Sequence, residues 1–193
     1  MSSNLASDLS NHFLIAMPNM ADPNFGGTVV FVAEHGPDGA LGLVVNRPMD
    51  FDVERLFERI ELPLQSRAHA GDPVYYGGPV QTDRGFVLHQ PIGHWGSTVV
   101  VGEAGGDGLG LTSSKDILEA VGIGEGPQRL LVALGYSGWG PGQLEDEVSR
   151  NAWLTTPASA SLMFDTPVDQ RVGRAFALLG VDPAFLTGSA GHA

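Results

Sequence analysis

Residues 129–153 hold the side chains best suited to chemistry, above all the run Gly-Tyr-Ser-Gly-Trp at 135–139. A serine after an apolar strand and before a helix approaches the nucleophile elbow of α/β-hydrolases, which reads G-x-S-x-G. Trp139 stands where that elbow has its last glycine, and the histidine that must follow could only be His192. The run therefore predicts a glycine turn rather than a hydrolase site, with Tyr136 and Trp139 packed and hydrogen-bonded.

Histidines beside polar residues form a second group, in the pairs Asn11-His12 and Glu34-His35 and at His89. Imidazole and carboxylate groups are common zinc ligands. Neighbouring residues on a strand point to opposite faces, so Glu34 and His35 cannot easily share one ion, and no H-E-x-x-H pattern is present. We expect structural histidines at strand ends and no metal site.

Phosphate-binding patterns are missing from the sequence. Lys115, the only lysine, lies in Ser-Ser-Lys-Asp without a Walker loop, and the glycines at 106, 108 and 110 do not give the dinucleotide fingerprint. The pair Gly77-Gly78 indicates a tight turn after a strand. Arg47 and Arg84 are scarce positive charges that could bind an anion, although pairing with carboxylates is the simpler role. The sequence predicts no cofactor.

An acidic segment after Pro141 is expected to form a helix, because acids are stabilised near a helix N-terminus. Gln143, Glu147 and Asn151 are spaced by four and share one helical face. That face could be merely solvated. Alternatively, together with Tyr136 and Trp139 it could form a patch that recognises a partner, because aromatic residues next to charge are typical of interface hot spots.

The composition excludes several classes of protein. The chain has 193 residues, no cysteine and a formal net charge of -12, from 22 acids against 10 bases. Disulfides and cysteine-based metal sites are ruled out, and direct nucleic-acid binding is disfavoured because it needs a basic patch. No apolar run approaches the roughly 20 residues that span a bilayer, and the N-terminus has no secretory signal. We expect a cytoplasmic protein.

Hydrophobic periodicity and turn signals predict the elements. About seven strands and three or four helices are expected, and several strands form hairpin-like pairs. This pattern indicates an α+β domain with a mixed, mainly antiparallel sheet. The expected strands cover residues 13–16, 28–34, 40–46, 74–76, 85–89, 97–101 and 130–134, with 162–164 as a further candidate. The expected helices begin at Asp50 or Asp52, at Ser113, after Pro141 and near Val168. Residues 1–10 and 186–193 are expected to be flexible.

Several sequence blocks stand in a distinctive order. They include N-H-F-L-I-A-M-P-N-M-A-D-P-N-F from Asn11, G-A-L-G-L-V-V-N-R-P, Y-G-G-P-V, and G-Y-S-G-W-G-P-G-Q-L-E-D-E-V. In these blocks the chain resembles the YqgE/AlgH family of bacterial proteins, over nearly its whole length. The resemblance implies a single α+β domain with a sheet folded toward a pseudo-barrel, and no established activity. Some members are labelled transcriptional regulators because of genetic effects.

The leading functional hypothesis is a non-enzymatic domain that binds an unknown protein or small molecule, with a regulatory role. The first alternative is a hydrolase or metal-dependent enzyme that uses Asn11, His12, Glu34, His35 and Arg47, which requires these residues to meet in one pocket. The second is a transcriptional regulator. The candidate surface comprises Asn11, His12, Glu34, His35, Asn46, Arg47, Gly77, Gly78, Arg84, His89, Tyr136, Ser137, Trp139, Gln143, Glu145, Glu147 and Asn151.

Overall fold

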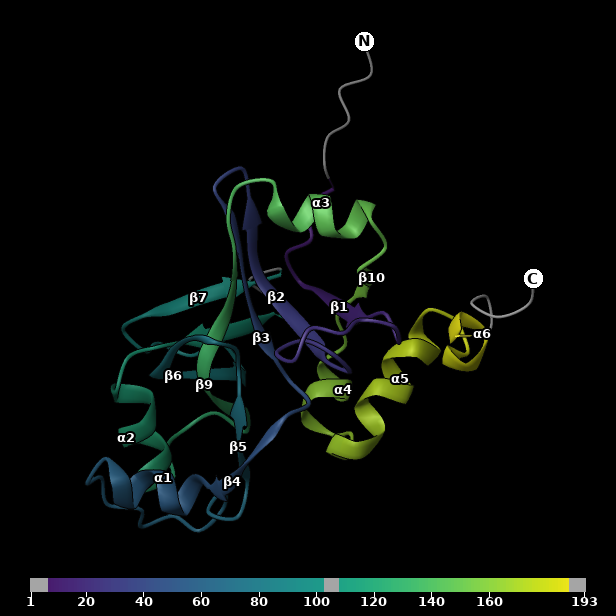
Figure 1. The fold of residues 1–193 in the computed structure, drawn as a ribbon. Coiled ribbons are helices and arrows are strands. Elements are labelled where there is room, and N and C mark those ends of the chain that lie inside the picture. The colour runs from purple at the N-terminus through teal and green to yellow at the C-terminus, as the bar shows by residue number, and fades with distance from the viewer. Residues whose placement is uncertain (1–6, 103–107, 188–193) are drawn as a thin grey trace, which may run out of the picture.

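A computed structural model describes residues 7–102 and 108–187, and it shows an α+β fold (Figure 1). The strands of this part are β1 (His12–Ala16), β2 (Val29–Gly36), β3 (Gly39–Val44), β4 (Pro48–Asp52), β5 (Pro73–Tyr76), β6 (Val80–Gln90), β7 (Thr98–Val101), β8 (Leu109–Thr112), β9 (Arg129–Trp139) and β10 (Trp153–Pro157). Its helices are α1 (Val53–Arg59), α2 (Asp116–Ile123), α3 (Gln143–Ser149), α4 (Ala160–Phe164), α5 (Arg171–Leu178) and α6 (Pro183–Thr187), with a 3-10 turn at Val168–Gln170.

Strand β9 joins two halves of one strongly curved sheet. The strand order is β10-β1-β2-β3-β9-β6-β8-β7, while β4 pairs with β5 beside this path. All of these pairs are antiparallel except that of β5 with β9, which is parallel. The C-terminal end of β9 pairs with β3, and its N-terminal part pairs with β6 on one edge and β5 on the other. The sheet is therefore mixed but mainly antiparallel, as the sequence predicts.

A glycine inside β9 allows this strand to change partners. Gly135 has a φ of +75°, and a Cβ at this position would lie 2.4 Å from the carbonyl oxygen of Gly78. Gly78 itself has a φ of +155° and sits as closely against the backbone of Tyr136. Only glycine meets both demands, because it has no side chain and tolerates positive φ. The chain thus crosses β9 at Gly77-Gly78 between β5 and β6.

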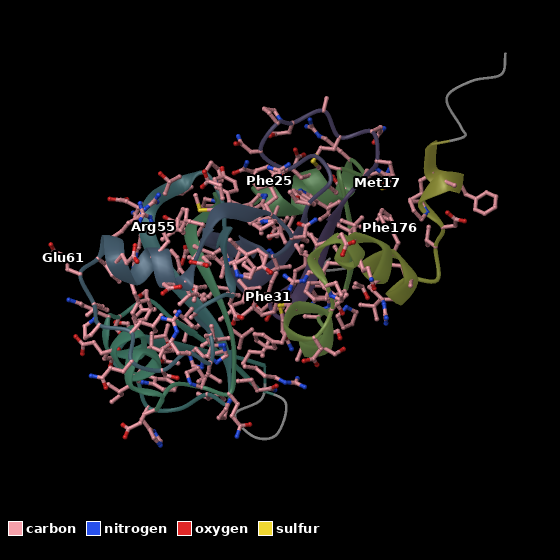
Figure 2. The ribbon with its side chains drawn as sticks, turned by 90° about the horizontal axis from the view of Figure 1, so that it is seen from below. Met17, Phe25, Phe31, Arg55, Glu61 and Phe176 are labelled. Atoms are coloured by element: carbon pink, nitrogen blue, oxygen red, sulfur yellow. The ribbon has the colours of Figure 1, made fainter. Side chains whose placement is uncertain are left out.

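Three apolar clusters lie between the sheet and its helices. Alternation along β1 sends Phe13 and Ile15 toward α4 and α5, and Leu14 and Ala16 toward α3. The third cluster packs β5, β6 and β9 against α1 and α2. Figure 2 shows α1, which carries Arg55, and α5, which carries Phe176, on opposite sides of the molecule. Each group of helices therefore covers a different part of the sheet.

Several expected elements are confirmed, with small shifts at their ends. The strands at 13–16, 28–34, 40–46, 74–76, 85–89 and 130–134 all form, and Asp52 caps α1 by accepting a hydrogen bond from the Arg55 amide. Gly180 ends α5 with a φ of +67°, as a glycine after a helix commonly does. The described part has six α-helices rather than three or four. The additional ones, α4 and α6, are only five residues long, which is too short to show a helical periodicity in the sequence.

Other expectations are wrong. Residues 135–139 belong to β9 and form no turn. Residues 162–164 lie in α4, because the Ser159 hydroxyl caps a helix there by accepting from the Leu162 amide. Strand β7 is not buried, since Val99 and Val100 are about two-fifths exposed on the edge of the sheet. The helix expected at Ser113 begins at Asp116 without a side-chain cap, and β4, β8 and β10 have no counterpart among the expected strands.

The predicted glycine-rich connection at 102–110 lies partly outside the described residues, which resume at residue 108. Of the terminal segments predicted to be flexible, residues 1–6 and 188–193 also lie outside them. Residues 8–10 are held against β2: the amide of Leu9 donates to His35 Nδ1 at 2.9 Å, and the His35 amide donates to Ser10 Oγ at 3.0 Å. Within the described ranges, no helix is long and apolar enough to cross a membrane.

Candidate functional site

A histidine and a glutamate join the β2–β3 hairpin to α3. His35 Nε2 lies 2.7 Å from Glu145 Oε1, and the His35 side chain is 3% exposed. The Leu9 amide donates to Nδ1, so the proton of neutral His35 resides on Nε2 and is donated to Glu145. The pKa of Glu145 is lowered first by its own backbone N–H and further by this hydrogen bond. Both imidazole nitrogens are occupied by hydrogen bonds. The His35–Glu145 pair therefore has a structural role and links α3 to the β2–β3 hairpin.

Two tryptophans share one carboxylate beneath α3. The indole N–H groups of Trp139 and Trp153 donate to Glu147 Oε2 at 2.8 and 2.9 Å. The ring of Phe25 packs against both indoles, with centroid distances of 6.0 and 5.5 Å. Gln143 donates to the other oxygen of Glu147 at 3.3 Å. The indole N–H of Trp139 thus finds the hydrogen-bond partner that the sequence predicts, and both indoles are turned inward. The hydroxyl of Tyr136, for which a partner is also predicted, makes no hydrogen bond within the described residues, and its ring packs against Phe86.

The serine of the Gly-Tyr-Ser-Gly-Trp run is unsuited to nucleophilic attack. Ser137 is fully buried, and its hydroxyl donates to the carbonyl of Gly77 at 3.1 Å. This bond fixes the crossing of the chain over β9. Gly77 is needed for close approach, because a Cβ there would lie 2.3 Å from the oxygen of Gly135. The Gly77-Gly78 pair therefore serves backbone packing.

Asn46 and Arg47 hold the loop that precedes β2. Asn46 Oδ1 accepts from the amide of Val29, and its Nδ2 donates to the carbonyl of Gly27. The guanidinium of Arg47 donates to the carbonyls of residues 23, 24 and 26. These side chains satisfy backbone groups of a non-repetitive segment, which would otherwise lack partners. Arg47 therefore bonds backbone carbonyl groups rather than the carboxylate expected from the sequence as its partner.

The remaining residues of the proposed enzyme site are likewise dispersed. His12 Nδ1 bonds the carbonyl of Ser10 at 3.0 Å, and Asn11 takes a φ of +60° at the start of β1. Asn151 takes a φ of +61° just after α3, a conformation that asparagine tolerates. The enzyme hypothesis requires the five residues to meet in one pocket, but of these residues only Glu34 lines a pocket described for this structure. Among the described residues, no group of three or more acids or histidines could hold a metal ion.

His89 is fully buried in strand β6. Its Nδ1 bonds the carbonyl of Pro91 at 2.9 Å and its Nε2 bonds Thr112 Oγ1 at 2.7 Å. Burial lowers the pKa of His89, because it disfavours the charged imidazolium, while the Pro91 carbonyl acts in the opposite direction. This position at a strand end agrees with a structural histidine.

Three candidate residues do line one surface depression, of about 490 Å³. They are Glu34, Tyr136 and Trp139, and Asp38 joins them there. Its charged side chains are both acidic, so the depression would suit a cationic group. Trp139 is 5% exposed, however, so it offers the depression little surface.

A different groove has the character of a small-molecule site. It lies between α1, α2 and the sheet, has a volume of about 500 Å³, and falls within the usual range of ligand pockets. Its walls are predominantly apolar and include Leu56, Phe86, Val87, Leu118, Val132 and Leu134. Sequence reasoning does not predict this groove, because its walls come from five separate elements.

Positive charges gather around the groove. Arg59 and Lys115 line it, and Arg84 reaches it by donating to Ser113 Oγ at 3.3 Å. Of the ion pairs within 7–102 and 108–187, none includes these three side chains, whereas Arg55, Arg67, Arg129 and Arg150 each contact an acid. Asp83 is the carboxylate that lines the groove. The arrangement can take an apolar molecule with an anionic end.

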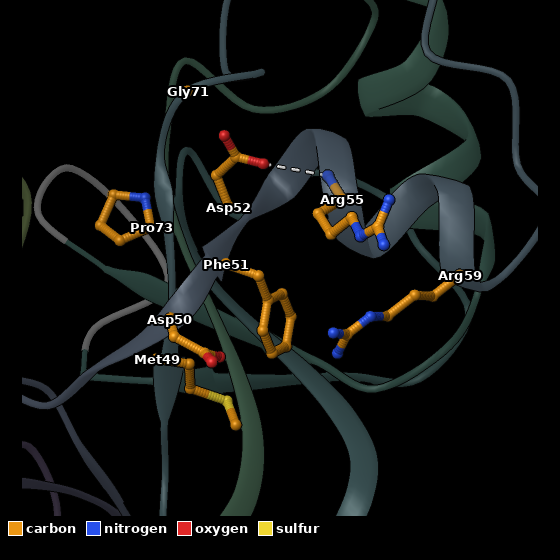
Figure 3. A pocket seen from close by; sticks show the side chains of 8 residues that line it. All are labelled: Met49, Asp50, Phe51, Asp52, Arg55, Arg59, Gly71 and Pro73. Atoms are coloured by element: carbon orange, nitrogen blue, oxygen red, sulfur yellow. Dashed lines mark hydrogen bonds between the residues drawn. The ribbon is translucent and has the colours of Figure 1, made fainter.

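A shallower pocket adjoins the groove and shares Arg59 (Figure 3). Its polar side chains largely engage one another or the protein backbone. Asp52 accepts from the Arg55 amide, the Arg55 guanidinium pairs with Glu58 at 2.8 Å, and the Arg59 guanidinium lies 4.2 Å above the Phe51 ring. Figure 3 shows Arg59 extended toward Phe51. The apolar groove is therefore the stronger candidate.

Comparison with known proteins establishes the relationships of the chain. A family model described as AlgH-like matches residues 13–184. The chain belongs to this AlgH-like family. A UPF0301 protein of Azoarcus sp. is 56% identical over 97% of this chain and 98% of its own length. A UPF0301 protein of Cupriavidus pinatubonensis is 55% identical over 96% of both chains.

Solved structures agree with the AlgH-like fold. The solution structure of the AlgH protein from Pseudomonas aeruginosa has a TM-score of 0.78 and 46% identity, with both chains covered completely. A Corynebacterium diphtheriae protein has a TM-score of 0.64 and 20% identity, covering 85% of this chain and 83% of its own, so it supports the fold alone.

In this AlgH-like chain, the scarcity of bases was the one sequence signal that pointed toward the groove. Lys115 is the only lysine, and Arg84 is a scarce cation that sequence reasoning singles out as a possible anion ligand. Arg59 falls on the exposed face of a predicted helix and gives no such signal. The sequence could not reveal that α1 and α2 bring these cations to one apolar surface.

Proposed function

We propose that the protein is a non-enzymatic binding domain whose groove takes a small molecule with an apolar body and an anionic end, and that this binding has a regulatory role. The observation that carries the proposal is the apolar groove rimmed by Arg59, Lys115 and Arg84. Apolar walls favour a hydrocarbon or aromatic body. Cations without carboxylate partners favour an anionic group, in a chain whose net charge is -12.

The arrangement of candidate catalytic residues supports binding rather than a reaction. Ser137 is buried without a base, and His35 has both ring nitrogens occupied. Direct nucleic-acid binding is disfavoured because three cations in a groove do not form the extended basic surface that a phosphate backbone requires. A regulatory role would then operate through a small ligand.

Calorimetric titration with octanoate, octanol and octylamine tests the proposed groove ligand. Octanoate should bind most tightly, and the double variant R59Q/K115Q should weaken its binding by about tenfold, the effect expected of a lost charge contact. Octanol binding should change little. R150Q is the matched control, because Arg150 is exposed and pairs with Asp146 on α3. Equal affinity for octanoate and octanol, or an unchanged R59Q/K115Q titration, would contradict the proposal.

The non-enzymatic part is tested separately with p-nitrophenyl and phosphate esters. No turnover above buffer is expected from the purified protein. Turnover that is lost in Ser137→Ala or His35→Ala would show that the protein is an enzyme, whatever the groove binds.

A second candidate is binding of a basic protein segment, favoured by the acidic depression with Glu34 and Asp38. Lysine-rich peptides should then bind with an affinity that falls as salt is raised. The double variant E34Q/D38N should remove this binding and leave octanoate binding intact. If peptide binding is unchanged both by higher salt and by E34Q/D38N, the depression is not the peptide-binding site.

A further inference from the structure

Arg171 is a buried cation at the start of α5. The residue is 6% exposed, and its guanidinium lies 5.0 Å above the ring of Tyr75. Nε donates to the carbonyl of Thr166 at 3.0 Å, and Nη1 donates to the carbonyl of Val45 at 2.5 Å. The guanidinium thereby links α5 to the end of β3.

These contacts leave the charge of Arg171 without a carboxylate partner. No fully buried side-chain nitrogen or oxygen among the described residues lacks a hydrogen bond, so the remaining donor of Arg171 keeps some access to solvent or to a neighbouring cavity. No carboxylate within the described residues approaches Arg171 to 4.0 Å, and its Nη2 makes no hydrogen bond there. Two carbonyls and an aromatic face offset some of the cost of burying the charge. A buried charge is nevertheless normally paired, because desolvation is expensive.

A cavity of about 140 Å³ lies against this guanidinium. A water molecule occupies about 30 Å³, so the cavity has room for a molecule of several heavy atoms. Its walls are Tyr75 on β5, Leu130, Leu131 and Val132 on β9, and Met163 and Phe164 on α4. Asp72 and Pro73 also line it, and the Asp72 side chain is 45% exposed and bonded to His69 at 2.7 Å.

We propose that this cavity is a second binding site, for a small monocarboxylic acid whose carboxylate pairs with Arg171. A planar carboxylate matches the two-pronged donor geometry of a guanidinium. The cavity is mixed in polarity: Leu130, Met163 and Phe164 can contact a short hydrocarbon body, while Arg171 offers the charge. Inorganic phosphate is disfavoured, because it has no apolar part and the Asp72 carboxylate would repel its larger charge more strongly. The site is separate from the groove and shares only Val132 with it.

The experiment follows the Arg171 side chain directly by the NMR signal of its Nε–H group in isotopically labelled protein. Butyrate is titrated at constant ionic strength, with chloride as the compensating anion, and butyramide serves as its neutral counterpart. Butyrate should give a saturable shift of the Arg171 signal and of Tyr75 and Met163, whereas butyramide and inorganic phosphate should not. The K115Q variant should give the same butyrate titration, because Lys115 belongs to the groove.

Variants strengthen the test. Arg171→Met keeps the length of the side chain without its charge and should abolish the saturable shifts of Tyr75 and Met163. Arg171→Lys should weaken binding by about tenfold, because a lysine cannot form the two-pronged pair. If Arg171→Met does not fold, the wild-type comparison of butyrate with butyramide decides alone. No saturable shift, the same shift with butyramide, tighter binding of phosphate, or unchanged binding by Arg171→Met would each overturn the proposal.

Discussion

The imidazole of His35 lies 2.7 Å from the carboxylate of Glu145, although 110 residues separate them along the chain. This contact fastens α3 to the β2–β3 hairpin. His35→Gln and Glu145→Gln should each lower the free energy of unfolding by about 1–2 kcal/mol, because the first removes the imidazole donor and the second removes the negative charge of the acceptor. The double variant should lose less than the sum, since the two residues share one contact. Urea denaturation of all four proteins measures the coupling, and strictly additive losses would argue against it.

Glu147 satisfies two buried indole groups at once. Glu147→Ala should destabilise the protein by about 3 kcal/mol, because the N–H groups of Trp139 and Trp153 would be left without acceptors. Asp146→Asn is the control, since the adjacent Asp146 makes only an exposed ion pair with Arg150 and should cost less than about 1 kcal/mol. Thermal denaturation followed by tryptophan fluorescence reports both. Similar losses in the two variants would contradict the shared-acceptor role.

Gly135 and Gly142 form a matched pair for testing backbone approach. Their φ angles are +75° and +73°, but an added Cβ would collide with the Gly78 carbonyl only at Gly135, while it meets nothing within 4 Å at Gly142. Gly142→Ala should cost about 1–2 kcal/mol from conformational strain alone. Gly135→Ala should cost clearly more, or prevent folding. Urea denaturation or solubility measures the two losses of stability. Equal losses would show that the Gly77-Gly78 segment can shift to make room for a side chain at position 135.

His89 predicts a dependence of stability on pH. Its pKa in the folded protein lies below the ordinary value of 6.5, so the unfolded chain binds the proton more readily. Its contribution is therefore complete above pH 6.5, and it is lost as the pH falls from 6.5 toward the folded pKa. Between pH 7.5 and 5.5, His89→Gln should show a smaller loss of stability than the wild-type protein. His94→Gln, at an exposed histidine, should follow the wild-type curve, and a His89→Gln curve that also follows it would refute the assignment.

Sequence patterns predict an element correctly where the local sequence signal and the tertiary packing favour the same structure. Alternation in β1 and β2 and the Asp52 cap of α1 are examples, because a strand or helix of that length carries enough information by itself. Residues 162–164 were ambiguous, since three apolar residues fit a strand or a helix equally well. The run Thr98–Val101 looks buried because it is apolar throughout, yet its position at the sheet edge exposes Val99 and Val100.

The candidate site was less predictable than the fold. Gly135 reads as part of a turn, whereas its real constraint comes from Gly78, more than fifty residues away. From the sequence, the helical face with Glu147 could be solvated or form a recognition patch with Trp139. In the structure Glu147 accepts from the buried indoles of Trp139 and Trp153 instead, and Glu145 on the same helix pairs with His35. The groove and the Arg171 cavity depend on packing between elements that are distant in sequence, so no local pattern could reveal them.

Strand β9 also limits how this sequence can change in length. Its residues before Gly135 are in register with β5 and β6, and those after it are in register with β3 and β6. Removing or adding one residue would turn the following side chains to the wrong face and misalign two sets of neighbours together. Insertions and deletions should therefore be tolerated in connections such as 63–72, whereas β9 should keep its length of eleven residues and accept substitutions only at positions other than Gly135.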